Sequence, residues 1–560
     1  MTPRQTALAA TALLAYALLG WILFPGHTWL QSDTQIYVPI LERQYDASLF
    51  ARDEIALRPH VKFTFYDEIT VALRRLTGAG FRDVLAAQQF VFRIAGAAGA
   101  FLAALALGLP PAGALAGAGL FGLGAVINGP AVLTLEYEPV PRGFAVLCTM
   151  LALGLAMHRR WMWAGAAAVI ATLYHPTTTA PFWVCLLLHW RYAHDRREGI
   201  ALELSVAAAA AGLAVIAILQ PFGADRQVML GRIPPELEQI QKYRAPYNWI
   251  SLWPKAWLWQ YPLLAALAWA AWRRIRDAIR PEARFLSAAL AGYGLAMIPL
   301  QWLLLDLGKW ILMPQFQPAR AVLWVAVMAE MLALAAAWHA AGQRRWKEAA
   351  AWMFAAFLLS AAGAAPLVEL WQYPERVAAV AAAAALALAG ARWQRLAPVG
   401  AAAAFALIPA IGRVELYPKL HSPELDALSA WARHSTGKDD VFLFADAGRR
   451  LEPGVFRAQA LRALYVDWKS GGQANLLRDY GYEWKRRWEA VREARPPLLE
   501  MEEYARMGVD WIVVSPVNAP RGAAPAFRNA RFAVFSTRAA APENGPSPRA
   551  KGSKPARPGG

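Results

Sequence analysis

About thirteen long apolar blocks, separated by short charged connectors, fill the first 412 residues of this 560-residue chain. A helix needs about 20 apolar residues to cross the hydrocarbon core of a bilayer, and one soluble core cannot absorb so many uncharged runs. Charged residues make up only 17% of the sequence, well below the roughly 25% of soluble proteins. We therefore predict an all-α polytopic membrane domain of about thirteen transmembrane helices over residues 1–412. The blocks lie at roughly 6–24, 88–109, 112–128, 141–157, 161–175, 178–191, 200–220, 256–272, 285–305, 320–339, 348–367, 376–391 and 397–412.

The connectors between the blocks predict how the chain is oriented in the membrane. Five of them are short and carry arginine, which is typical of cytoplasmic loops. With the N-terminus in the cytoplasm, all five lie on that side. The orientation depends on breaks at Pro110-Pro111 and His175-Pro176, because a kink at either place would reverse every later connector. The arginine-bearing connectors are 158–160, 191–198, 273–284, 342–348 and 391–395.

The composition also excludes several function classes. The formal charge is +17, but the arginines stand at the ends of apolar blocks, so nucleic-acid binding is not indicated. Cys148 and Cys185 lie inside apolar blocks and are expected to be small core residues. The patterns GxxxxGK[ST], HExxH and CxxC do not occur, which argues against an internal nucleotide-binding domain and against these metal sites.

Beyond the membrane helices we expect two large outer loops and a soluble domain. The first outer loop runs from about 25 to 84 and holds amphipathic stretches at Gln35–Tyr45 and Asp67–Leu76, which we place at the membrane surface. Residues 413–538 alternate between helical and strand patterns, which favours a small extracytoplasmic α/β domain. Its predicted strands are 441–445 and 511–515. Residues 539–560 are rich in Pro, Gly and Lys, and we expect them to be disordered.

The first outer loop carries the strongest candidate for catalysis. Asp33 comes soon after the first apolar block, and Tyr37 follows four residues later. A carboxylate held at the membrane surface can act as a general base on an acceptor hydroxyl. The alternative is that Ser32 or Asp33 caps the helix that follows.

A second acidic element lies between the third and fourth apolar blocks. Glu136 and Glu138 flank Tyr137, and Arg142 opens the next helix. In an extended segment the two carboxylates would point to the same side and could share a substrate hydroxyl or a divalent cation. They could instead be solvated acids at the level of the lipid headgroups, paired with Arg142.

Three further residues are candidates for binding a phosphate or a hydroxyl. His175 stands at the outer end of the fifth block, where it could instead cap or pack against a helix end. Lys309 and Arg320 flank the outer connector between the ninth and tenth blocks. Such cations would stabilise an anionic leaving group, although pairing with phospholipid headgroups is the alternative.

This arrangement resembles the GT-C superfamily of membrane glycosyltransferases, which includes protein O-mannosyltransferases and the aminoarabinose transferase of lipid A. The segment SDTQIY, with Asp33 and Tyr37, matches the key acid of the family's first outer loop, and Glu136-Tyr137-Glu138 matches its second acidic element. Segments at 431–445 and 456–472, the latter with an FR…R…D-x-K run, look like those of poorly characterised bacterial members. The WWDYG motif of the oligosaccharyltransferase subunit does not occur, so transfer to asparagine is not implied.

The resemblance implies an inverting transferase in the bacterial cytoplasmic membrane. The donor would be a sugar on a polyprenyl phosphate, and the acceptor a glycan, lipid or protein on the outer side. Asp33 would deprotonate the acceptor, Lys309 or Arg320 would hold the phosphate, and Tyr37, Glu136, Glu138, Arg142 and His175 would bind substrate. No cofactor is implied, because members that use lipid monophosphate donors need no metal.

Two other functions remain open on sequence grounds. A transporter or lipid flippase should carry ionisable groups near the middle of the membrane, and Glu330 is the main such residue. A polysaccharide polymerase or ligase would also have large outer loops.

Overall fold

The computed structural model describes residues 2–58, 64–193, 196–219, 230–493, 500–520 and 522–538. The tail predicted to be disordered lies outside this part. Each of the thirteen apolar blocks corresponds to a helix, so the predicted all-α membrane domain is confirmed as a fold. These helices are α1 (Pro3–Ile22), α4 (Phe81–Ala106), α5 (Pro111–Leu123), α6 (Pro141–Met157), α7 (Trp161–Tyr174), α8 (Pro176–Ala193), α9 (Arg196–Leu219), α11 (Lys255–Ile275), α12 (Pro281–Gln301), α14 (Val322–Gly342), α15 (Trp346–Ala362), α16 (Pro374–Arg392) and α17 (Ala397–Gly412).

The breaks at Pro110-Pro111 and His175-Pro176, on which the predicted orientation depends, each separate two distinct helices. The chain leaves α4 before Pro110, and His175 has an extended backbone between α7 and α8. Of the described helices, six are long and apolar enough to cross a membrane by length and composition, and four shorter apolar helices accompany them. The span that contains α14 is the most enclosed, because every residue of its most apolar 18-residue stretch is buried.

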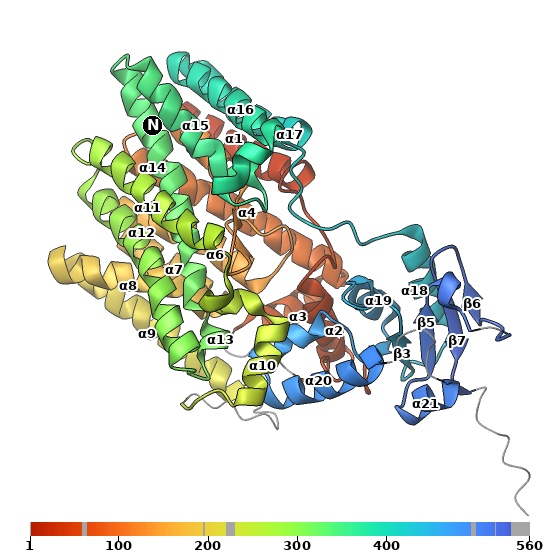
Figure 1. The fold of residues 1–560 in the computed structure, drawn as a ribbon. Coiled ribbons are helices and arrows are strands. Elements are labelled where there is room, and N and C mark those ends of the chain that lie inside the picture. The colour runs from red at the N-terminus through yellow and green to blue at the C-terminus, as the bar shows by residue number, and fades with distance from the viewer. Residues whose placement is uncertain are drawn as a thin grey trace, which may run out of the picture.

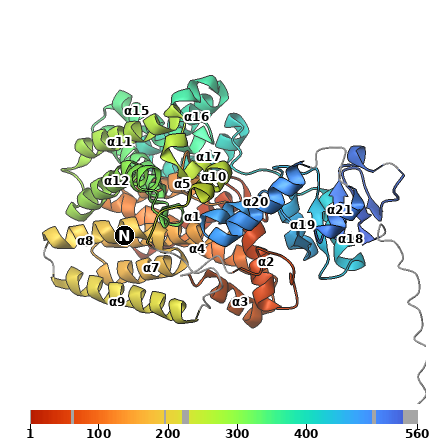
Figure 2. The ribbon, with the colours of Figure 1, turned by 60° about the horizontal axis from the view of Figure 1, so that its bottom comes forward.

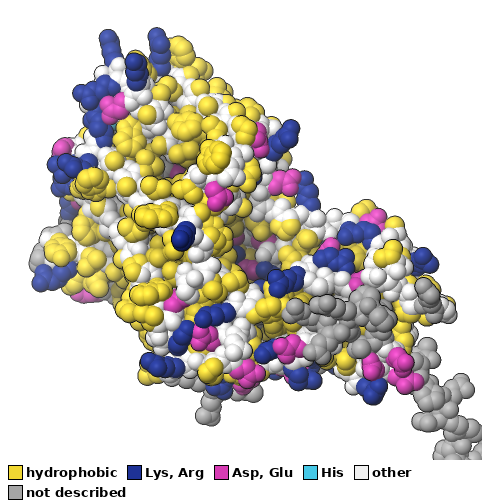
Figure 3. Space-filling model, in the orientation of Figure 1, with side chains coloured by type: hydrophobic (Ala, Val, Ile, Leu, Met, Phe, Trp, Pro, Cys, Tyr) yellow, Lys and Arg dark blue, Asp and Glu magenta, His cyan; other side chains and the backbone are white. Residues whose placement is uncertain are grey.

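The arginine-bearing connectors gather at one end of the bundle. Arg159 pairs with Glu282 at 3.5 Å, and Arg274 pairs with Glu348 at 2.6 Å, which joins connectors far apart in sequence. Figure 1 places the N-terminus at the end of the bundle away from the sheet. In Figure 3, hydrophobic side chains cover the visible flank of the bundle, and Lys and Arg gather at its upper end. This arrangement is the one expected of cytoplasmic connectors.

The first outer loop forms two helices, as its amphipathic stretches predict. They are α2 (Thr34–Tyr45) and α3 (Tyr66–Thr77). Helix α3 packs against α2 and α4, and α2 approaches α19 (Glu452–Ala460) of the C-terminal part of the chain (Figure 1). The outer loop therefore links the helical bundle to the region that contains the sheet.

Asp67 of α3 gives a pH-dependent prediction. The carboxylate is buried and accepts a hydrogen bond from Gln44 (3.1 Å), and burial together with the nearby charge of Glu68 raises its pKa to about 7. Because the folded state holds this proton more tightly than the unfolded chain, stability should fall as pH rises from about 4 to 7. Asp67→Asn should therefore stabilise the protein at pH 8 by about 2–4 kcal/mol, measured as a higher melting temperature. The gain should shrink towards pH 5, and a gain independent of pH would contradict the assignment.

The C-terminal region contains a five-stranded mixed sheet. Its order is β4 (Ala463–Leu464), β3 (Val441–Phe444), β5 (Trp511–Val514), β7 (Ala533–Ser536) and β6 (Phe527–Arg528). β3 pairs in parallel with β4 and β5, and β7 pairs antiparallel with β5 and β6. The two predicted strands are thus confirmed as β3 and β5, the centre of the parallel part.

Four helices accompany this sheet. They are α18 (Pro423–Ser435), α19, α20 (Arg478–Glu493) and α21 (Met501–Arg506). Ser422 caps α18 by accepting a hydrogen bond from the Leu425 N–H (3.3 Å). Helix α20 extends back against the bundle beside α10 (Pro235–Arg244), whereas α18, α19 and the sheet project to the side (Figures 1 and 2). Through α20 and the turn before it, the C-terminal region reaches the end of the bundle opposite the arginine-bearing connectors.

Candidate functional site

A polar cavity of about 240 Å³ lies where the outer loop, the bundle and the C-terminal region meet. Five of the eight residues predicted for the site line it: Asp33, Tyr37, Arg142, His175 and Arg320. Arg244 and Lys469 add two more cations. The other lining residues are Ser32, Ile36, Ala131, Tyr247, Gln315, Gln317, Gly472, Gln473, Asn475 and Leu476.

Asp33 occupies the N-terminal position of α2, but its side chain does not cap the helix. One carboxylate oxygen accepts a hydrogen bond from Lys469 Nζ (2.6 Å), and the other pairs with Arg142 Nη1. Burial opposes the charge of Asp33, but the ammonium of Lys469 and the guanidinium of Arg142 outweigh it. Together they hold the pKa of Asp33 well below its usual range. Asp33 is therefore a carboxylate at neutral pH, clamped between two cations.

Glu138, rather than Ser32 or Asp33, accepts a hydrogen bond from the first N–H group of α2, that of Thr34 (3.4 Å), on one of its oxygens, and it also binds the turn before the helix. The other oxygen accepts hydrogen bonds from the backbone N–H groups of Gln31 and Ser32 (2.7 Å each) and from the Thr34 hydroxyl (2.5 Å). Its side chain is buried and does not line the cavity. Glu138 thus fixes the turn that presents Asp33.

Glu136 also positions another residue of the site, because it binds the Arg142 guanidinium. Arg142 Nε donates to Glu136 Oε1 (2.7 Å), so one guanidinium bridges Glu136 and Asp33. Glu136 is buried and does not line the cavity. The two glutamates are directed at different partners, so the shared carboxylate pair expected from an extended segment does not form.

Replacing Glu138 tests the positioning of the turn. Glu138→Ala leaves two buried N–H groups and one hydroxyl without an acceptor, which should cost about 2–4 kcal/mol in stability. Glu138→Gln should cost much less, because the three short hydrogen bonds all end on one oxygen that an amide can replace. The melting temperature of the two variants checks this, and equal losses would contradict it.

Lys469 reaches Asp33 because a buried ion cluster anchors the turn before it. Arg457 donates to Asp467 (3.1 Å) and to the backbone oxygen of Gln35 (3.1 Å), and Asp53 lies 3.9 Å from the same guanidinium. Asp467 also accepts a hydrogen bond from the Ser470 N–H (2.9 Å). This cluster joins the outer loop to the C-terminal region directly behind the cavity.

Two other contacts hold the same turn. Arg244 donates to the backbone oxygens of Trp468 (2.6 Å) and Lys469 (3.0 Å) and stacks on the Trp468 ring. A Cβ atom on Gly471 would lie 2.2 Å from the Trp484 ring, so only glycine permits this approach. The turn is therefore packed as tightly as a core element.

Arg320 lies in η4 (Pro318–Ala321), the short helix directly before α14, and differs from the other cations of the cavity. Its Nε atom is buried without a hydrogen-bond partner in the part of the chain that the structure describes. Arg142 and Lys469 are already paired with Asp33, and Arg244 binds backbone oxygens. Arg320 is thus the cation best placed to bind an added anion.

Lys309 does not join the site. Its ammonium pairs with Glu238 (2.6 Å) and lies over the Trp249 ring, and it does not line the cavity. Of the two cations that the sequence proposed for the leaving group, only Arg320 is therefore in place.

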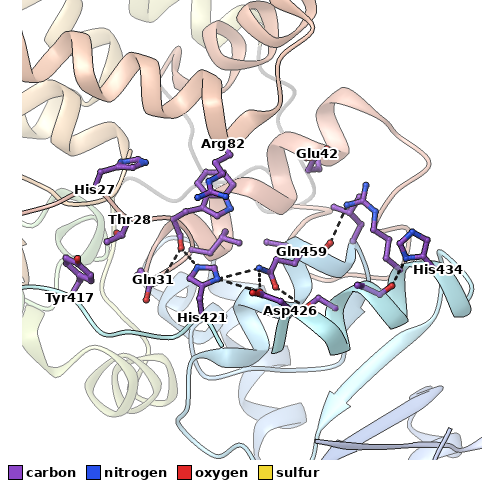
Figure 4. A pocket seen from close by; sticks show the side chains of 17 residues that line it. His27, Thr28, Gln31, Glu42, Arg82, Tyr417, His421, Asp426, His434 and Gln459 are labelled. Carbon is purple, nitrogen blue, oxygen red and sulfur yellow. Dashed lines mark hydrogen bonds and ion pairs between the residues drawn. The ribbon is translucent and has the colours of Figure 1, made fainter. Parts of the chain in front are cut away.

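A second, larger cavity of about 1070 Å³ lies between the outer loop and α18. Figure 4 shows its polar side chains engaged with one another: His421 approaches the Trp29 backbone oxygen (2.5 Å) and Asp426 (3.9 Å), and Gln459 donates to Asp426 (2.9 Å). Its charged lining residues balance, with Glu42 and Asp426 against Arg82 and Arg433. The smaller cavity, with four cations against Asp33, is the one suited to an anion.

Lys469, Gln473 and Asn475 are the site residues that sequence reasoning missed. The D-x-K end of the FR…R…D-x-K run contains Lys469, but nothing in a soluble domain signals contact with a loop more than 400 residues earlier. The sequence feature that could have pointed to Lys469 is the FR…R…D-x-K run itself. In the structure its members Arg457 and Asp467 form an ion pair that anchors the turn carrying Lys469. Among the described residues, no group of three His, Cys, Asp or Glu side chains is arranged to hold a metal ion.

No protein-family model matches the sequence, and no curated protein matches it. A structure of ArnT from Cupriavidus metallidurans bound to undecaprenyl phosphate is similar with a TM-score of 0.48 and 14% identity, covering 96% of this chain and 98% of that one. The apo structure of the same protein gives a TM-score of 0.45 and 14% identity, covering 95% and 97%.

Proposed function

We propose that the chain is an inverting membrane glycosyltransferase that takes a sugar from a polyprenyl phosphate and gives it to a hydroxyl acceptor. The observation that carries this proposal is the cavity itself, where one ionised carboxylate lies among four cations at the outer end of an apolar helical bundle. A lipid phosphate and a reacting hydroxyl need these two kinds of group side by side.

In the proposed reaction, the acceptor oxygen attacks the anomeric carbon while the bond from that carbon to the phosphate oxygen breaks. The phosphate leaves with the bonding electrons and remains on the lipid. The acceptor proton passes to Asp33. Attack opposite the leaving group inverts the anomeric configuration.

The depressed pKa of Asp33 makes it a weak base while both cations are paired with it. An arriving phosphate competes for Lys469 and Arg142, because charge-assisted hydrogen bonds to phosphate are strong. Donor binding would draw these cations away and raise the basicity of Asp33. The site would then be switched on by its own donor.

Arg320 supports this role because its guanidinium faces the cavity without a partner at Nε. It would bind the phosphate as negative charge develops on the leaving oxygen. Glu136 and Glu138 act indirectly, by fixing Arg142 and the turn that carries Asp33.

The direct test uses the full chain reconstituted in lipid vesicles. The probes are undecaprenyl phosphate carrying a ¹⁴C-labelled hexose or aminopentose, with a bacterial envelope extract as the source of acceptor. We expect label to move from the lipid to the acceptor fraction and undecaprenyl phosphate to be released in equal amount. Folded protein that neither binds undecaprenyl phosphate in preference to undecaprenol nor moves label from any donor would overturn the proposal.

A further inference from the structure

Two amide side chains from the C-terminal region line the cavity without hydrogen-bond partners. Gln473 and Asn475 belong to η7, a short helix at Ser470–Asn475 that follows Lys469. Their side chains are only 9% and 5% exposed. Gln473 Oε1 and Asn475 Oδ1 are buried without a partner among the described residues.

Such groups are costly unless something satisfies them. A buried polar atom without a hydrogen bond destabilises a protein by about 1–3 kcal/mol, so most are paired. Exchanging the assigned oxygen and nitrogen of either amide would not give the buried atom a partner. The amide nitrogens of Gln473 and Asn475 also make no hydrogen bond within the described residues. The neighbouring Gln315, by contrast, donates to the Leu476 backbone oxygen (3.2 Å). Gln473 and Asn475 are therefore available to a ligand.

The charge around the amides limits what this ligand can be. Four cations line the cavity, and Asp33 with the adjacent Glu136 offsets two of them. One lipid phosphate would offset a third, which leaves an excess of positive charge. A sugar bearing an ammonium group would be repelled, whereas neutral hydroxyl groups can donate to and accept from amides.

We propose that Gln473 and Asn475 bind the transferred sugar by its hydroxyl groups, and that this sugar is uncharged and hydroxylated rather than one bearing an ammonium group. The inference rests on the proposed function and assigns sugar selection to the C-terminal region. The same turn supplies Lys469, so one segment holds both the general base and the sugar.

The test compares binding of three kinds of probe to the full chain in nanodiscs. They are undecaprenyl phosphate alone, undecaprenyl phosphate linked to glucose, mannose or galactose, and undecaprenyl phosphate linked to 4-amino-4-deoxyarabinose. At least one hexose conjugate should bind more tightly than the bare lipid phosphate and than the amino-sugar conjugate. Gln473→Met and Asn475→Leu should each reduce that preference by about 10-fold and leave binding of the bare lipid phosphate unchanged.

A second measurement separates binding from folding. Without a ligand, each variant should melt at or above the temperature of the unmodified protein, because it removes an unsatisfied buried group. Gln394→Leu, an exposed change in the 391–395 connector, is the matched control and should alter neither measurement.

The outcomes distinguish this inference from the proposed function. Tightest binding of the amino-sugar conjugate, an unchanged hexose preference in both variants, or a lower melting temperature in both would overturn the inference alone. Failure of the unmodified protein to bind bare undecaprenyl phosphate would overturn the proposed function and the inference with it.

Discussion

Asp33→Asn should lower the turnover number for glycosyl transfer by about 10²–10⁴-fold, the usual contribution of a general base. The amide cannot accept the proton of the acceptor hydroxyl. The substitution also leaves Lys469 without its carboxylate partner, so the cavity becomes more positive. Binding of the donor phosphate should therefore be unchanged or tighter, and the defect should appear in kcat rather than in the KM for the donor.

Asp46→Asn is the matched control, because Asp46 is an exposed acid in the same outer loop. It should transfer sugar at the normal rate. Both variants should insert and melt like the unmodified protein, since Arg142 keeps its contact with Glu136. A normal turnover number for Asp33→Asn would remove Asp33 from the role of base, and a raised donor KM would instead indicate a binding role.

The helical fold was predictable from the sequence because lipid permits few alternatives. A segment in the hydrocarbon core must satisfy its own backbone hydrogen bonds, so each apolar block can only be a helix. The strands β3 and β5 could also be predicted from the sequence, because each is a continuous apolar run typical of buried parallel strands. The strands β4 and β6 have two residues each and are too short to give a pattern.

The candidate site was predictable in part. Asp33 and Arg142 stand at helix starts on the same predicted side, so the order of the helices alone brings them near each other. Glu138 was harder to interpret, because the sequence cannot tell an acid that binds substrate from one that caps a neighbouring turn. Lys469 depends on packing between regions separated by more than 400 residues, which no local pattern records.

Lys309 and Arg320 also show that a role which depends on tertiary contacts cannot be assigned from the sequence alone. Both are cations that flank the connector between two apolar helices, and the sequence gives them equal weight. The pairing of Lys309 with Glu238 depends on how the loop before α11 folds back on the connector after α12. The choice between the two cations is thus a property of tertiary structure, and it leads to a paired experiment.

Arg320→Gln should reduce kcat/KM for a lipid-linked sugar by about 10²–10³-fold, the range seen when one donor to a developing oxyanion is removed. The reason is that the Arg320 Nε atom is buried without a partner among the described residues, so the charge of this cavity cation is available to the leaving phosphate. Binding of undecaprenyl phosphate alone should weaken as well, because the same charge attracts the phosphate before reaction. Lys309→Gln is the matched control, and it should leave kcat/KM within about 3-fold, since the ammonium is paired with Glu238 outside the cavity. Equal losses in the two variants would mean that the cavity is not where the phosphate binds, and a loss only in Lys309→Gln would transfer that role to the neighbouring connector.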